Sequence, residues 1–331
     1  ALLGDDEARE RAARLLRRVA QAERGEHELD VISGNAGAIA GLIVLRDLLD
    51  DAALVEWAAR LGDELVRVAE RSAAGWSWRS ADFPRQRPLT GFAHGAAGVA
   101  YALLELYHAT GGAVYRAAAE AAFAYERGWF DVAAGNWPDF RERPGGKSGK
   151  QMPHAFAASW CHGAPGIALS RLRAYALLGD DRYRAEALTA LRTTYGNVES
   201  ALASGRDSFS LCHGLAGNAE VLLAGERVLG SECPGGAVLA LEVARAGMGA
   251  FGKPGLRWDH GGGVGETPGL LLGLAGIGYS YLRLRDPTTP SILLIERDGF
   301  GGRGGGEDGT AEGAEDAEEG EDTERGHGVR T

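Results

Sequence analysis

A motif of small residues that recurs five times constrains the fold of this 331-residue chain more than any other feature. Each copy reads G-x-x-G and precedes an apolar segment with helical spacing. The first glycines of the copies are Gly34, Gly95, Gly163, Gly214 and Gly273, so successive copies lie 61, 68, 51 and 59 residues apart. A period of this length accommodates two helices and their loops, which predicts a chain built from a repeated helical hairpin.

Amphipathic segments alternate with the motif segments. They cover approximately residues 1–22, 51–72, 112–128, 180–195 and 236–251. Their apolar residues follow the i, i+3, i+4 spacing of a helix with one buried face, whereas the segments after the motifs are apolar nearly all round. This alternation predicts an all-α fold of inner and outer helices, an α/α toroid, in which glycine lets inner helices approach closely at one end. A plain helical solenoid, in which glycines only end loops, is the alternative.

Charge and cysteine content exclude several classes of protein. The net charge is −11, of which −7 falls within residues 299–331, so the remaining chain is nearly neutral and offers no basic surface for nucleic acid. No segment approaches the roughly 20 apolar residues of a membrane span. Three cysteines do not make a disulfide framework, which favours a reducing, cytoplasmic setting.

Two segments fall outside the repeat. Residues 131–158 are rich in loop-forming residues and are predicted to form an excursion at one rim of the ring. Residues 299–331 are Gly-rich and acidic and are predicted to be a disordered tail. The chain is therefore divided into a helical domain, residues 1–298, and the tail, residues 299–331.

Cysteine and histidine recur at one position of the motif. His94, His162 and His213 each precede a motif glycine, and Cys161 and Cys212 precede two of these histidines. Because equivalent positions of a ring meet at one end of the inner helices, these side chains are expected to converge. Two thiolates and one neutral imidazole would neutralise Zn²⁺, and three protein ligands leave an open position. The alternative is that the thiols are small buried apolar residues.

Asp30 and His94 fall on the same rim, just ahead of the first and second motif glycines. Either side chain can act as a general acid or base. The structural alternatives are helix capping for Asp30 and an ordinary polar contact for His94. Cys233 lies outside the motif register and is given no role.

These motifs resemble those of the lanthionine synthetase C-like cyclases. The likeness covers about residues 29–296 and is greatest to the C-terminal cyclase domain of class II lanthipeptide synthetases, the LanM type. It rests on LTGFAHGAAGVAYALL (89–104), WCHGAPGIAL (160–169), LCHGLAGN (211–218), and on GNWPDFR (135–141) and PSILLIE (290–296).

The resemblance implies a site and a reaction. The implied zinc ligands are Cys161, Cys212 and His213. The implied acid–base groups are His94 and Asp30. His162, which follows Cys161 in the sequence, is a further candidate acid that ranks below His94. The implied reaction adds a peptide Cys thiol to dehydroalanine or dehydrobutyrine and forms lanthionine or methyllanthionine thioether rings. The substrate would be a precursor peptide that carries Cys and dehydrated Ser or Thr.

The chain also departs from the family it resembles. That family has seven inner and seven outer helices, whereas five motif copies occur here, so an N-terminally truncated toroid with about five of seven hairpins is expected. The N-terminal dehydratase region of class II enzymes would belong to the full-length protein.

Two other functions compete with the cyclase. One is a non-catalytic module of the same fold that binds peptides or thiols such as glutathione. The other is a carboxylate-based enzyme such as a glycosidase on a similar toroid. The second is disfavoured because the rim positions hold His and Cys instead of paired acids.

Overall fold

Helices form where the repeat predicts them. The computed structural model describes residues 5–22, 25, 27–141, 154–205, 208–259 and 266–296, which all belong to one compact unit spanning Ala1–Gly301. The helices that follow the motif glycines are α2 (Asn35–Leu49), α4 (Ala96–Thr110), α6 (Ala164–Leu178), α8 (Leu215–Leu229) and α10 (Leu274–Arg285). The amphipathic helices are α1 (Asp6–Gln21), α3 (Ala53–Val68), α5 (Ala113–Gly128), α7 (Asp181–Ser204) and α9 (Gly236–Phe251). A short hairpin of β1 (Glu70–Ser72) and β2 (Gly75–Ser77) follows α3, and a 3-10 turn, η1 (Gly230–Glu232), follows α8.

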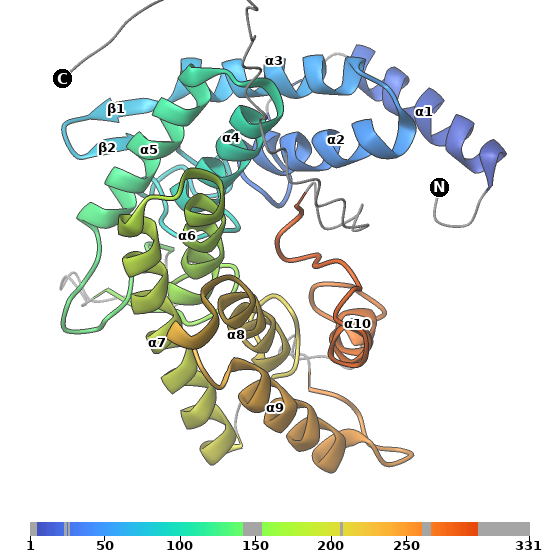
Figure 1. Cartoon of the computed structure of the whole chain (residues 1–331), viewed down its shortest axis with the longest axis vertical. Helices are drawn as coiled ribbons and strands as arrows, with labels where there is room; N and C mark the ends of the chain where they lie inside the picture. Colours follow the sequence, from blue (N-terminus) through green and yellow to red (C-terminus); the bar gives the residue numbers. More distant parts are fainter. Residues whose placement is uncertain are drawn as a thin grey trace, which may run out of the picture. The chain divides into compact units, whose positions relative to one another are not determined.

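The two sets of helices form an inner and an outer layer. Each of α2, α4, α6 and α8 packs against the next helix in sequence, and the five inner helices pack one against the next from α2 to α10 (Figure 1). This arrangement confirms the predicted all-α architecture. Helices α4 and α6 are buried along most of their length, whereas α10 buries Gly276, Ile277 and Ser280. Helix α7 runs nine residues beyond the expected end at 195. None of the helices in the described ranges combines the length and hydropathy needed to cross a bilayer.

The second glycine of each motif leaves room for backbone. A Cβ on Gly98 would lie 1.9 Å from the carbonyl oxygen of Phe92, and one on Gly166 would lie 2.0 Å from that of Trp160; the other three copies show the same approach. The loop before each inner helix thus folds back over the first turn of its own helix. The side chain of Val31, in the neighbouring loop, would be 2.6 Å from a Cβ on Gly98. The predicted close approach between repeats therefore exists but is secondary to the approach within each repeat.

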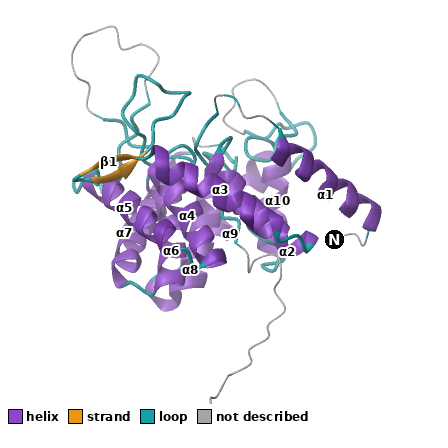
Figure 2. Ribbon diagram, turned by 90° about the horizontal axis from the view of Figure 1, so that it is seen from above, coloured by secondary structure: helices purple, strands orange, loops and turns teal. Residues whose placement is uncertain are grey.

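Backbone hydrogen bonds join the five loops into a ladder. The amide of Val31 donates to the carbonyl of Ala93 (3.1 Å), and the amide of Ala93 donates to that of Cys161 (3.0 Å). The amide of Cys161 donates to the carbonyl of Cys212 (3.3 Å), and the amide of Cys212 to that of Leu271 (2.9 Å). The long loops gather at one end of the helices (Figure 2). Side chains at equivalent motif positions are thereby brought to the same end.

The predicted excursion is a loop in its described parts, residues 131–141 and 154–158; residues 142–153 lie outside them. It is anchored to the start of α6 by Asn136. The Asn136 side-chain oxygen accepts from the amide of Ala164 (2.8 Å), and its nitrogen donates to the carbonyl of Ala157 (2.9 Å). This part of the loop is therefore fixed against the inner layer.

The last described segment, residues 290–296, packs into the core instead of extending away. Leu293 and Leu294 are buried, and the Trp160 indole donates to the carbonyl of Leu293 (2.9 Å). The Tyr101 hydroxyl donates to the carbonyl of Ile295. The predicted tail, residues 299–331, lies outside the described residues.

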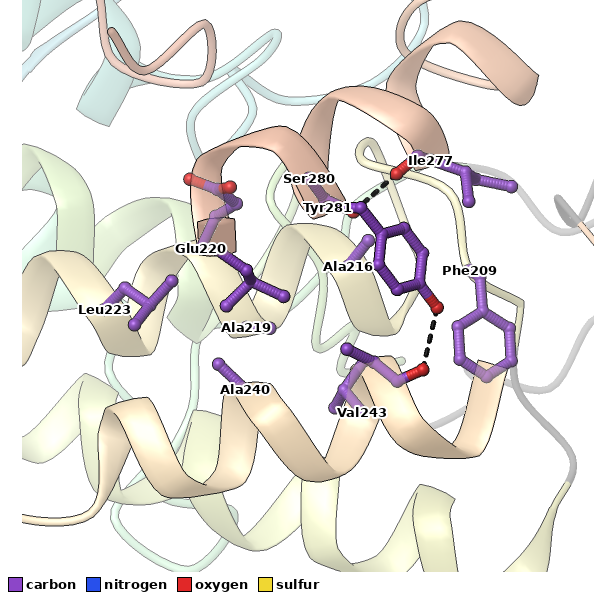
Figure 3. Close-up of a pocket in the computed structure, with 12 residues that line it drawn as sticks. Phe209, Ala216, Ala219, Glu220, Leu223, Ala240, Val243, Ile277, Ser280 and Tyr281 are labelled. Atoms are coloured by element: carbon purple, nitrogen blue, oxygen red, sulfur yellow. Dashed lines mark hydrogen bonds between the residues drawn. The ribbon is translucent and has the colours of Figure 1, made fainter. Parts of the chain in front are cut away.

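A pocket lies between α8, α9 and α10 (Figure 3). Its lining is mainly apolar, with the carboxyl group of Glu220 at one side and the Tyr281 hydroxyl, which donates to the carbonyl of Ala244 (2.8 Å). None of the predicted site residues lines it. It is a packing gap where the inner layer meets α9.

Glu126 joins the two layers at the start of α4. This fully buried carboxylate on α5 accepts hydrogen bonds through Oε1 from the amides of Gly91 (3.0 Å) and Ala97 (2.9 Å). Burial raises the pKa of Glu126 to about 7, although the charge of Arg171 and the two amides favour ionisation. The folded state therefore binds a proton in a pH range where the unfolded chain has lost it.

This shift predicts that stability falls as pH rises from about 4.5 to about 7, by roughly 3 kcal/mol for this one group. Glu126→Gln keeps an oxygen for both amides and removes the titration, so the fall should be much smaller. Glu126→Ala leaves two buried donors unpaired and should cost about 2–4 kcal/mol at every pH. Urea unfolding at about pH 5 and about pH 8 measures both effects. A Glu126→Gln variant with the pH dependence of the parent would contradict this account.

Candidate metal and acid–base site

Three potential metal ligands converge at the loop end of the inner helices. The thiols of Cys161 and Cys212 and the imidazole of His213 each offer an atom within 4.8 Å of the other two. Cys161 comes from the loop before α6, and the other two come from the loop before α8. The backbone hydrogen bond between the cysteines holds these loops in register. The structure thus brings together the three residues that the resemblance implied.

The Cys161 and Cys212 thiols shift each other's pKa in opposite directions. The pKa of Cys161 is lowered, mainly because the Cys212 thiol donates a hydrogen bond to its sulfur and further because of a hydrogen bond from His213. The pKa of Cys212 is raised for the converse reason, since it retains the proton of that hydrogen bond. The hydroxyl oxygen of Ser159 lies 3.3 Å from the Cys161 sulfur. Two sulfurs that already stabilise one negative charge, with an imidazole beside them, are a soft donor set that can hold a metal ion.

His94 and Asp30 form a second pair at this end. His94 Nδ1 lies 2.6 Å from Asp30 Oδ2, and the carboxylate is fixed in turn because its Oδ1 accepts from the amide of Ser33 (2.9 Å). Asp30 is nearly fully buried, and the His94 side chain is one-fifth exposed. The hydrogen bond to Asp30 raises the pKa of His94, and burial opposes this only in part. Nε2 is left as the ring nitrogen for a ligand.

His162 lies against His94 but differs in its surroundings. The two rings are stacked, with centroids 5.7 Å apart. His162 is 1% exposed, and neither of its ring nitrogens has a hydrogen-bond partner among the described residues. Burial lowers its pKa to about 4, so the ring is neutral near pH 7. In this arrangement the buried His162 ring packs against one face of the His94 ring.

Sequence reasoning missed two neighbours of the site. Arg141, held by Asp139, is close enough that its charge acts on the pKa of His94 and of Cys212, although the Asp30 and Cys161 hydrogen bonds dominate those two shifts. Phe83 meets the His94 ring edge to face, with centroids 6.2 Å apart. The signal for Arg141 was present in GNWPDFR (135–141), but that stretch served only as evidence for the resemblance.

Comparisons with known proteins address the family and the fold of the chain. The sequence matches the family model described as "Lanthionine synthetase C-like protein" over residues 1–295. Among solved structures, nisin cyclase is similar with a TM-score of 0.54 and 20% identity, over 83% of this chain and 69% of that chain. A GH76 alpha-mannanase from Bacteroides thetaiotaomicron has a TM-score of 0.48 and 16% identity, over 79% of this chain and 69% of that chain. No curated protein matched the sequence.

The likeness to nisin cyclase shows the fold, and together with the helix packing it confirms the predicted α/α toroid type. The family model spans nearly all of the described residues. The chain belongs to the lanthionine synthetase C-like protein family.

Proposed function

We propose that this protein is a zinc-dependent cyclase that adds peptide Cys thiols to dehydroalanine or dehydrobutyrine and forms thioether rings. The observation that carries this proposal is the Cys161–Cys212–His213 cluster at the same end of the inner helices as the His94–Asp30 pair. A site for a thiol and a site for a proton are the two requirements of this addition. Membership of the family supports the assignment.

The resemblance to class II synthetases supports two finer proposals. The substrate is a precursor peptide with Cys and dehydrated Ser or Thr, and the cyclase is the C-terminal part of a bifunctional synthetase whose dehydratase makes the dehydro residues. Cys161, Cys212 and Cys233 are free thiols, which supports the proposal that the protein acts in the reducing cytoplasm.

The donor set of the cluster fits zinc. Two thiolates balance the charge of Zn²⁺, the imidazole completes three protein ligands, and a fourth position is free for a substrate thiol. When bound, zinc would hold the peptide thiol and lower its pKa so that it is a thiolate near pH 7.

The remaining chemistry falls to His94 and Asp30. As the peptide thiolate forms a bond to Cβ of the dehydro residue, the C=C electron pair moves toward the α-carbon and its carbonyl oxygen. Protonated His94 donates from Nε2 to the α-carbon, which restores the carbonyl and completes the addition without any oxidation or reduction. Asp30 holds Nδ1, orients the ring and stabilises its charged form, as its effect on the pKa of His94 requires.

The function is tested with a dehydrated peptide that carries Cys. The cyclised product is an isomer of the substrate, so reaction must be followed by loss of alkylatable thiol, measured as missing mass adducts. We expect zinc-loaded protein to remove thiols faster than a protein-free control. If the protein binds the peptide but leaves the rate at the control value, the proposal is wrong and a non-catalytic peptide-binding module is favoured.

Metal content tests the ligand set. The parent should contain about one zinc per chain by elemental analysis, and Cys161→Ala and Cys212→Ala should each lose most of it, because two ligands rarely retain the ion. Cys233→Ala is the matched control, since this cysteine lies outside the cluster. Equal zinc in all three variants would show that the ion is bound elsewhere.

The acid role of His94 predicts a pH dependence. The rate should fall as pH rises through the raised pKa of His94, because the proton donor is lost. Asp30→Asn keeps the acceptor for the Ser33 amide but removes the charge, so this fall should move to lower pH. An NMR titration of His94 should show the same downward shift of its pKa.

His94→Gln, with zinc retained, should lower the rate by about 10²–10⁴. Asp181→Asn, which alters an exposed carboxylate on α7, should change neither profile nor rate. An Asp30→Asn variant with the parental pH profile would rule out His94 as the acid.

A further inference from the structure

Arg141 presents an unused hydrogen-bonding edge beside the site. Its Nε and Nη2 donate to the Asp139 carboxylate at 3.0 and 2.6 Å. Nη1 has no hydrogen-bond acceptor among the described residues, and the side chain is about one-third exposed. A guanidinium held along one edge by a carboxylate keeps its remaining donors in a fixed direction.

The position of Arg141 is built by the same loops that carry the site. The amide of Asp139 donates to the carbonyl of Ala155 (2.7 Å), and the Thr90 hydroxyl donates to the carbonyl of Pro138 (2.6 Å). These two bonds tie the Arg141 segment to the loops that lead to Cys161 and to His94. The segment of Arg141 is therefore attached to both of these loops.

The charge of Arg141 acts on the titratable groups of the site. Burial disfavours its charged form, but the Asp139 hydrogen bond and the negative charges of Asp139 and of the Cys161 thiolate outweigh burial and raise the pKa of Arg141. Arg141 also contributes to the low pKa of His162, after the larger effect of burial. A permanent cation is thus near enough to the thiols and to both imidazoles for its charge to act on them.

We propose that Arg141 donates a hydrogen bond from Nη1 to the carbonyl oxygen of the dehydro residue and stabilises the negative charge that gathers there. This inference rests on the proposed cyclase function. As the S–Cβ bond forms, the C=C pair moves through the α-carbon to the carbonyl oxygen, where Arg141 meets it. When His94 Nε2 delivers its proton to the α-carbon, the pair returns to form the Cα–H bond. Asp139 is a positioning residue that aims the guanidinium.

A cation at this place would stabilise the enolate that forms during the addition. The carbonyl of a peptide is a weak electron acceptor, so its enolate is high in energy unless a donor stabilises the oxygen. Loss of one oriented donor to such an oxygen typically lowers kcat by about 10²–10³. Arg141 is the group of the described site that is always charged and free to donate.

The experiment compares Arg141→Met, Arg141→Lys and Asp139→Asn in the full chain. The control is Arg116→Met, which removes a similarly exposed arginine paired with Glu120 on α5. Each variant is assayed for zinc content, thermal unfolding, and kcat and KM for thiol loss. A dehydrated peptide whose Cys are replaced by Ser, and which cannot cyclise, serves as a binding probe by fluorescence anisotropy.

We expect Arg141→Met to lower kcat by about 10²–10³ with zinc content and unfolding temperature unchanged. Arg141→Lys should retain part of the parental kcat. The kcat of Asp139→Asn should lie between those of Arg141→Met and Arg141→Lys, and the kcat of Arg116→Met should equal that of the parent. Binding of the Cys-free peptide should weaken by about 3–10-fold in Arg141→Met, since the ground-state carbonyl makes a weaker hydrogen bond than the enolate. A further variant, Arg141→Ala, leaves space for a free cation, so added guanidinium ion below denaturing concentrations should partly restore its kcat, which a purely structural role would not allow.

Three results would overturn the inference. They are a parental kcat in Arg141→Met, a loss of zinc that accounts for the lost activity, and recovery of full activity in Arg141→Met at higher peptide concentration. If the parent itself forms no thioether, the proposed cyclase function is wrong. In that case the inference about Arg141 is judged by binding alone, and it is also wrong if Arg141→Met binds the Cys-free peptide as tightly as the parent does.

Discussion

The ladder of backbone hydrogen bonds between successive loops is the constraint on which the rest of this structure depends. It links Val31 to Ala93, Ala93 to Cys161, Cys161 to Cys212 and Cys212 to Leu271. A buried amide without an acceptor costs about 1–3 kcal/mol, so a shift of one loop by one residue is strongly disfavoured. The motif glycines make the ladder possible, because only a residue without Cβ lets each loop fold onto its own helix.

Buried ion pairs hold the inner layer in one register. Arg173 on α6 pairs with Glu105 on α4 through a 3.0 Å contact between Nη2 and Oε2, and both side chains are almost fully buried. Arg283 on α10 pairs in the same way with Glu220 on α8 (2.5 Å). Such pairs add little net stability, but a misaligned inner helix would leave a buried charge without its partner.

The site combines two opposite electrostatic demands at one end of this layer. The hydrogen bond from Cys212 lowers the pKa of Cys161 and so favours a negative charge there, whereas the Asp30 carboxylate raises the pKa of His94 and favours its protonated ring. The permanent positive charge of Arg141 acts on both pairs. The cysteine and histidine groups come from loops joined by the ladder, and the segment of Arg141 is tied to these loops through Asp139 and Pro138.

The sequence by itself determined the helical hairpin repeat, the inner and outer assignment of its helices and the loop end at which Cys161 and Cys212 meet, since all three follow from the spacing of glycines and apolar residues. Only the tertiary structure decided that His94 contacts Asp30, that the buried His162 ring stacks on His94 and that the charge of Arg141 acts on His94. Side chains on different loops are placed by packing and by hydrogen bonds between distant segments, such as the one between Asp30 and His94, which are 64 residues apart. The motif spacing placed Asp30 and His94 on the same rim, but it does not specify which side chains touch, because rotamers and packing between loops decide each contact.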